Sequence, residues 1–290
     1  MEVIAAEKTG NANATLTDFE SAIEKLDSIE TMPAVAQQLL QLTTDPDFNM
    51  GQLHDLVQTD QVIAAKILRV ASSPFYGSRP ATNLRAALIR IGMRDLRKLV
   101  MASAMMGTKT NAFTETLWSY SLKVGAIAEA IAQLVRTKDL DDPFLCGLMH
   151  DFGTVLMNQV IGKSYRTLLE KPCQENQRDL EFDSYGFDHC DLGVMVAQQW
   201  KLFEALEHVM QHHHDPLIVE ELGLAESSQV AVFLVALARQ VAMGLPEETT
   251  ELVTQLCERL ALSEEELEQC EAKGLERYDD MYSSLLPKST

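Results

Sequence analysis

The sequence predicts an all-α protein, folded as a helical bundle of two lobes. Apolar residues recur every three or four positions, which is the period of an amphipathic helix. Turn-forming residues separate these runs, at residues 45–47, 73–74 and 76–80. No convincing run alternates β-branched with polar residues, as a half-buried strand would. The apolar positions of the first three predicted helices are Val35, Leu39, Leu40 and Leu42, then Ile63, Ile67 and Leu68, then Leu84, Leu88 and Ile91.

The chain is predicted to divide into four parts. Residues 1–14 are small and polar, which predicts a disordered N-terminus. Residues 15–108 are predicted to form a first helical lobe and residues 109–216 a second, with the junction in the segment 105–112 (Met-Met-Gly-Thr-Lys-Thr-Asn-Ala). Residues 217–290 are predicted to add a C-terminal helical extension.

Caps and apolar faces define the helices after this junction. Asp142 before Pro143 predicts an N-cap followed by a proline in the first turn, and Asp188 predicts another N-cap. A helix from about residue 203 is expected to end in His212-His213-His214-Asp215-Pro216, where the proline stops it. The first helix of the second lobe has one apolar face made by Leu117, Tyr120, Val124, Ile127, Ile131 and Leu134. The last helices are predicted at residues 230–241 and after the capping box Ser263-Glu-Glu-Glu266.

The charge and composition exclude several classes of function. The 290 residues include 24 Lys and Arg against 43 Asp and Glu, a net charge of −19. Nucleic-acid binding and attachment to anionic membranes both need clustered basic residues, so neither is expected. No apolar run is long enough to span a membrane and the first residues do not resemble a signal peptide. The five cysteines lack a C-x-x-C pair, which is typical of a reducing compartment. We therefore expect a cytoplasmic protein.

Four histidines and one aspartate at predicted helix ends form a candidate metal site. They are His150, Asp151, His189, His213 and His214, and are called the His-Asp cluster below. Divalent metals bind neutral imidazoles and carboxylates drawn from several helices of one bundle. The alternative is that these histidines only cap helices or, near a helix C-terminus, interact favourably with the helix dipole. The pattern alone leaves both interpretations open.

Two stretches of the chain resemble a known family. The first contains Met32-Pro-Ala-Val35, Leu53-His-Asp-Leu-Val57 and Ala65-Lys-Ile-Leu-Arg-Val-Ala-Ser-Ser-Pro-Phe-Tyr-Gly77. The second contains Leu117-Trp-Ser-Tyr-Ser121, Phe144-Leu-Cys-Gly-Leu-Met-His-Asp-Phe-Gly153, Gly186-Phe-Asp-His189 and His213-His-Asp-Pro216. Over residues 20–220 the chain resembles the HDOD domain, a relative of the HD and HD-GYP metal-dependent phosphohydrolases. The resemblance implies two helical lobes, of which the second is HD-like.

The same resemblance indicates three residue departures from the hydrolases and one missing motif. Tyr120 stands where they have a first histidine ligand, and Thr154 replaces a lysine that can touch substrate phosphate. Leu237 aligns with the late aspartate ligand, and the Gly-Tyr-Pro signature is missing after His214. We therefore expect no catalytic residues and a vestigial or low-affinity metal set in the His-Asp cluster. No cofactor is expected, or at most one divalent metal among Mn, Fe, Zn, Ni and Mg.

The resemblance implies a non-catalytic signalling module that acts in bacterial signal transduction by protein–protein interaction. Its expected partners act in trans and are a sensor kinase, a response regulator or cyclic-di-GMP enzymes, and a homodimer is a further option. Phe75 and Tyr76 are candidate partner-binding residues, although an aromatic plug between helices explains them equally well.

Two other functions are weighed against this one. A metal-dependent phosphohydrolase acting on a nucleotide or phosphoester would need another carboxylate, for example Asp188 or Asp191, to reach the metal. A degenerate site that binds a nucleotide without cleaving it could use Arg94, Arg97 and Lys98.

Overall fold

The structure is a computed structural model, and the all-α prediction is confirmed. It describes residue 38 and residues 49–73, 75–76, 81–106, 111–135, 140, 142–169, 176–200, 202–244 and 251–285. Every regular element within these ranges is a helix. The predictions for residues 1–14, for the apolar positions Val35, Leu39, Leu40 and Leu42 and for the centre of the 105–112 junction lie outside the described residues.

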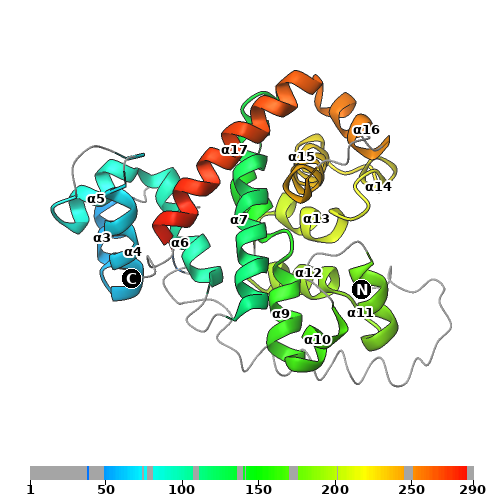
Figure 1. Cartoon of the computed structure of the whole chain (residues 1–290), viewed down its shortest axis with the longest axis horizontal. Coiled ribbons are helices and arrows are strands. Elements are labelled where there is room, and N and C mark those ends of the chain that lie inside the picture. The colour runs from blue at the N-terminus through cyan, green and yellow to red at the C-terminus, as the bar shows by residue number, and fades with distance from the viewer. Residues whose placement is uncertain are drawn as a thin grey trace.

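Among the described residues, four helices belong to the first lobe, at the left of Figure 1. They are α3 (Met50–Val57), α4 (Gln61–Ala71), α5 (Leu84–Ile91) and α6 (Met93–Met106). Asparagines begin two of them, because the Asn49 and Asn83 side chains accept hydrogen bonds from the free N–H groups of α3 and α5. Of the described apolar positions predicted from the spacing, Ile63, Ile67, Leu88 and Ile91 lie in the core, and Leu68 and Leu84 pack against it.

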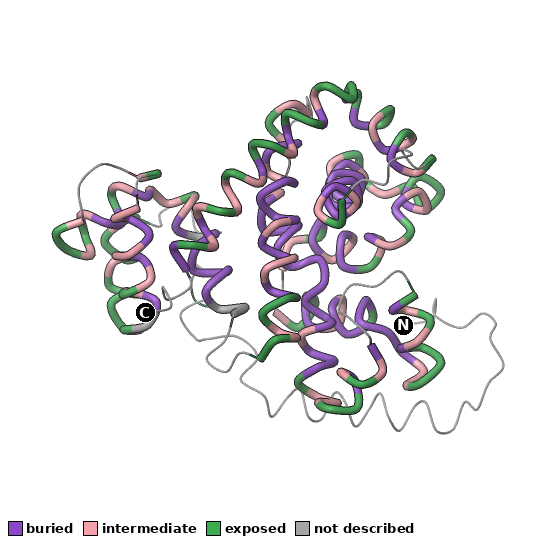
Figure 2. Tube along the Cα trace, in the orientation of Figure 1, coloured by how far each residue is buried: buried purple, intermediate pink, exposed green. Residues whose placement is uncertain are grey.

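The second lobe is built around the long helix α7 (Ala112–Ala132), which is buried along much of its length (Figure 2). Its helices are α8 (Pro143–Met149), α9 (Phe152–Ile161), α10 (Lys163–Leu168), α11 (Gln177–Tyr185), α12 (His189–Gln199) and α13 (Glu204–His212). α7 and α8 cross closely at two glycines, since a Cβ atom on Gly147 would lie 2.7 Å from the Cα atom of Gly125. This contact fixes the helix that leads into His150.

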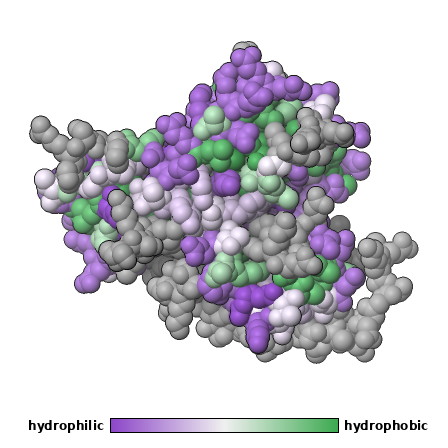
Figure 3. Space-filling model, in the orientation of Figure 1, coloured by the Kyte–Doolittle hydropathy of each residue, from purple (hydrophilic) through white to green (hydrophobic). Residues whose placement is uncertain are grey.

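The C-terminal residues pack against both lobes. Their helices are α14 (Ile218–Glu221), α15 (Glu226–Met243), α16 (Glu251–Leu260) and α17 (Glu264–Leu285). α15 is largely buried and packs against α7, α8 and α13, while α17 runs back along α7 and reaches α4 (Figure 1). Hydrophilic residues gather over the first half of α17 on the face in Figure 3. The predicted lobe boundaries themselves stay predictions.

The predicted caps are confirmed by hydrogen bonds. Asp142 accepts from the Leu145 N–H at 3.1 Å, and Asp188 accepts from the Asp191 N–H at the same distance. The capping box at Ser263 and Glu266 is also formed. Within the described part of the chain, no helix combines the length and the apolar character needed to cross a membrane.

Candidate functional site

The His-Asp pair lies in the turn between α8 and α9. His150 is the C-cap of α8 and Asp151 is the N-cap of α9. The turn directs both side chains into the interior, where His150 is 1% and Asp151 4% exposed. Gly153 permits this arrangement, because a Cβ atom there would lie only 1.7 Å from the backbone oxygen of His189. The beginnings of α9 and α12 are thereby brought together.

His150 and His213 present the same ring nitrogen to the site. His150 Nδ1 donates to the Gly147 carbonyl at 2.7 Å, and His213 Nδ1 lies 3.1 Å from two backbone carbonyls at the end of α13. Each Nε2 is therefore a lone-pair acceptor, and each is buried without a hydrogen-bond partner. The two rings lie 5.0 Å apart between centroids. Two unpartnered buried imidazole nitrogens are what a metal ion would satisfy.

Burial keeps these two imidazoles neutral. It lowers the pKa of His150 to about 4, although the neighbouring Asp151 charge acts in the opposite direction. It also lowers the pKa of His213 well below its usual value, with the nearby His214 and Arg239 acting in the same sense. Neutral imidazole is the form that binds metals.

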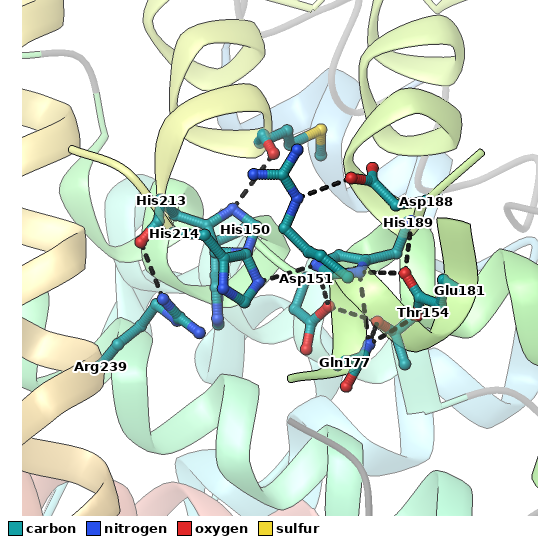
Figure 4. A network of polar contacts seen from close by, with 12 residues as sticks. His150, Asp151, Thr154, Gln177, Glu181, Asp188, His189, His213, His214 and Arg239 are labelled. Carbon is teal, nitrogen blue, oxygen red and sulfur yellow. Dashed lines mark hydrogen bonds and ion pairs between the residues drawn. The ribbon is translucent and has the colours of Figure 1, made fainter. Parts of the chain in front are cut away.

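His189 is held in the site by Glu181, a residue that sequence reasoning missed. His189 Nδ1 lies 2.6 Å from Glu181 Oε2, which also accepts the His189 backbone N–H at 2.8 Å. The other nitrogen, Nε2, lies 3.0 Å from His214 Nε2 and 3.6 Å from Asp151 Oδ1 (Figure 4). A buried carboxylate behind a histidine is the usual support of a metal-binding imidazole. Burial acts to lower the pKa of His189, but Cys190, Glu181 and Asp151 together hold it well above its usual value.

Thr154 connects Asp151 to this support. Its hydroxyl donates to Asp151 Oδ1, and the Gln177 amide donates to Thr154 Oγ1 at 2.7 Å and to Glu181 Oε1 at 2.9 Å. The predicted replacement of a lysine by Thr154 therefore puts a neutral hydrogen-bond donor next to the carboxylate. No lysine charge is added at this position.

Cys190 is a second site residue that the sequence analysis missed. One donor atom from each of His189, Cys190, His213 and His214 lies within 4.8 Å of the others. Burial raises the pKa of the Cys190 thiol. Imidazole and thiolate donors are typical of zinc and similar transition metals, whereas magnesium prefers oxygen ligands. The residues present therefore fit a transition metal, and magnesium is the poorest of the five metals considered.

The other two departures lie on α7 and α15. The Tyr120 ring lies 5.8 Å from the His150 ring between centroids, in an edge-on arrangement. Leu237 is fully buried in α15 and contributes an apolar side chain. Two residues further along α15, the buried Arg239 donates from Nη1 to the His213 carbonyl at 2.8 Å. Arg239 was not recognised from sequence, and it adds a positive charge beside the His-Asp cluster.

The two carboxylates proposed to complete a hydrolase site have other roles. Asp188 accepts the Asp191 N–H with one oxygen and lies 2.6 Å from Arg178 Nε with the other. Asp191 in turn accepts the Asp188 N–H at 3.0 Å. Both carboxylates cap the start of α12.

The aromatic pair in the first lobe makes an internal contact. Tyr76 donates to Asp95 Oδ2 at 2.9 Å, and Arg277 of α17 donates to the Tyr76 oxygen at 2.9 Å. The Arg277 guanidinium also lies 4.4 Å from the centre of the Phe75 ring, which is 49% exposed. Tyr76 thus joins helices, as the aromatic-plug alternative describes, while Phe75 keeps an accessible face.

The basic residues suggested for nucleotide binding do not form one site. Lys98 is 2% exposed and paired with Glu129 and Asp95, so its charge is already balanced. Arg94 is exposed, and the Arg97 side chain lies outside the described part of the structure.

An all-helical bundle with a buried His-Asp turn and inward-facing histidines defines an HD-like protein. The chain belongs to the HDOD domain family, whose model matches residues 29–216. The predicted resemblance is thereby confirmed.

Solved structures share the fold. An HDOD domain protein of unknown function from Geobacter sulfurreducens is 24% identical, with a TM-score of 0.68, covering 93% of this chain and 97% of that one. A candidate phosphohydrolase from Shewanella amazonensis SB2B is 23% identical, with a TM-score of 0.69, covering 92% and 98%. A candidate signal transduction protein from Marinobacter aquaeolei VT8 is 20% identical, with a TM-score of 0.71, covering 95% and 66%. At these identities the likeness shows the fold alone.

A curated relative extends beyond the matched region. An uncharacterized protein of Treponema pallidum (strain Nichols) is 22% identical over 201 residues, which are 67% of this chain but 39% of that protein. The chain therefore matches about two fifths of that relative's length.

Proposed function

We propose that this chain is a non-catalytic HDOD signalling module that acts by binding other proteins. The burial of most of the His-Asp cluster carries this proposal: His150, His189 and His213 are each 1% exposed, while His214 is half-buried. A hydrolase must bring a phosphoester within hydrogen-bond distance of its metal-bound water. Side chains buried this deeply contribute to the packing of the second lobe, and a substrate cannot reach them without a rearrangement.

The chemistry of the departures supports the same conclusion. A metal held by the His-Asp cluster and Cys190 would supply Lewis acidity and an activated water. The residues at two of the departures do not support hydrolysis. Thr154 provides no positive charge to bind a phosphate, and Leu237 provides no metal ligand. The proposed partners remain a sensor kinase, a response regulator or cyclic-di-GMP enzymes that act in trans.

A metal-dependent phosphohydrolase is the second candidate. One observation favours it: His150 Nε2 and His213 Nε2 are buried and unpartnered, as open ligand positions would be. This function requires the second lobe to open enough to admit a substrate.

The test is metal-stimulated hydrolysis of bis(p-nitrophenyl) phosphate, p-nitrophenyl phosphate and cyclic di-GMP by the full chain. Mn²⁺, Fe²⁺, Zn²⁺ and Ni²⁺ are each added, and Asp151→Ala is compared with Asp191→Ala, a capping carboxylate outside the proposed ligand set. We expect no turnover that depends on Asp151. Turnover that is lost in Asp151→Ala and kept in Asp191→Ala would overturn the proposed function.

A further inference from the structure

Arg239 is a buried cation beside the His-Asp cluster, and no described residue forms an ion pair with it. The side chain is 6% exposed, and its Nη1 donates to the backbone oxygen of His213. Its Nε is buried without a hydrogen-bond partner. The ion pairs identified among the described residues do not include Arg239. Figure 4 shows it below His213 and His214.

Two other cations, Arg178 near the cluster and the buried Lys98, are each paired with a carboxylate. Arg178, on the opposite side of the cluster, lies 2.6 Å from Asp188 and has a side chain 41% exposed. Lys98, buried like Arg239, is paired with both Glu129 and Asp95. Because solvent and a counter-charge screen a cation, the field of Arg178 is weak, whereas that of Arg239 acts fully on its neighbours.

The neighbours of Arg239 are the donors that would hold a metal. Arg239 Nη1 lies 2.8 Å from the backbone oxygen of His213, and Figure 4 shows the guanidinium beside His213 and His214. A divalent metal bound to these donors would carry two positive charges. The unscreened charge of Arg239 therefore opposes metal binding at this position.

We propose that Arg239 is the residue that determines metal occupancy of the His189–Cys190–His213–His214 site. Its fixed positive charge holds the affinity of these donors for a divalent transition metal at least tenfold below the affinity they would have beside a neutral residue. The inference rests on the proposed non-catalytic function and deepens it, because a site with weakened metal affinity cannot maintain an activated water.

An anion is a poorer occupant of this site. The Nε2 atoms of His150 and His213 are lone-pair acceptors, so they repel an oxyanion that Arg239 alone would attract. The donor set and the charge together point to a transition metal bound weakly.

The test uses zinc as the probe and the full, metal-stripped, untagged chain. The Kd is measured by competition with a chromophoric chelator for the wild type, Arg239→Met, Arg239→Lys and Arg178→Met. We expect Arg239→Met to bind zinc at least tenfold more tightly than the wild type. Arg239→Lys, which keeps the charge, and Arg178→Met, which removes a balanced charge, should stay within threefold of the wild type.

Two further measurements keep the test decisive. Arg239→Gln is also neutral and keeps an N–H donor for the His213 carbonyl, so it replaces Arg239→Met if that variant fails to fold. The wild type alone is informative as well: a nanomolar Kd, in the range of structural zinc sites, overturns the inference. An affinity in the neutral variants that is equal to or weaker than that of the wild type also overturns it.

The two proposals fail in different experiments. Equal zinc affinity in the wild type and the neutral variants overturns the role of Arg239 and leaves the non-catalytic function standing. Asp151-dependent phosphoester turnover overturns the function and is observed without any Arg239 variant.

Discussion

At the scale of single residues, Gly153 lets the His-Asp turn contact the start of α12. An added Cβ atom would lie 1.7 Å from the oxygen and 2.6 Å from the carbon of the His189 carbonyl group. Neither atom can move without shifting α12. The His-Asp pair and His189 therefore meet through a backbone contact that only glycine permits.

We expect Gly153→Ala to lower the free energy of unfolding by about 3 kcal/mol or more, at the upper end of overpacking effects. The matched control is Gly193→Ala on the same pair of helices, where the nearest atoms to an added Cβ lie 3.6 Å away. Urea unfolding of both variants measures the difference. Equal stability of the two variants would show that the helices separate easily at this contact.

His150 makes the stability of the metal-free protein sensitive to acid. Its pKa is about 4 in the fold and 6.5 without the fold, so the unfolded chain binds this proton first as the pH falls. Its contribution is complete above pH 6.5 and is lost as the pH falls through 4. Between pH 7 and pH 4.5 we expect His150→Gln to lose about 2–3 kcal/mol less stability than the wild type. Urea unfolding at the two pH values tests this, and an equal loss in both proteins would contradict it.

At the scale of helices, α17 connects the two lobes. Its residue Gly274 packs against Ile127 of α7, and the Tyr278 hydroxyl lies 2.7 Å from Ser119 Oγ. From the same part of α17, Arg277 contacts Tyr76 and Asp95 of the first lobe. At the C-terminal end of the helix, the Leu285 carbonyl accepts a hydrogen bond from Arg69 at 2.6 Å. The helix therefore fixes the position of the first lobe relative to α7.

We expect Arg277→Met to destabilise the protein by about 1.5–3 kcal/mol, because it removes charged hydrogen bonds to a half-buried carboxylate. Hydrogen exchange should rise in α4 and α6 and stay unchanged in α12 and α13. Arg259→Met is the control, since its ion pair with Glu220 is exposed and is expected to contribute about 1 kcal/mol or less. A uniform rise in exchange would show that α17 does not hold the first lobe specifically.

At the scale of the whole molecule, the sequence predicted the helices better than it predicted the contacts between them. Helical periods and caps are local signals, so the helices and the caps at Asp142 and Asp188 could be read from neighbouring residues. Glu181, Cys190 and Arg239 could not be, because their roles depend on contacts between helices. Arg239 lies 26 residues after His213 in the chain and donates to its carbonyl. The one available signal for Cys190 was its position next to His189.

The fold, the enclosed His-Asp cluster and the charge of Arg239 lead to one account of the molecule. Two helical lobes are joined by α17, and the second lobe buries His150, Asp151, His189 and His213. In this account the cluster stabilises the lobe, and signalling depends on surfaces that other proteins bind.

The most direct test of this account is metal-stimulated phosphoester turnover by the wild type, measured beside Tyr120→His. The substitution returns a histidine to the position where the hydrolases have their first ligand. The account predicts no turnover above that of free metal in either protein. Turnover by the wild type that Tyr120→His increases would contradict it and identify the chain as a working phosphohydrolase.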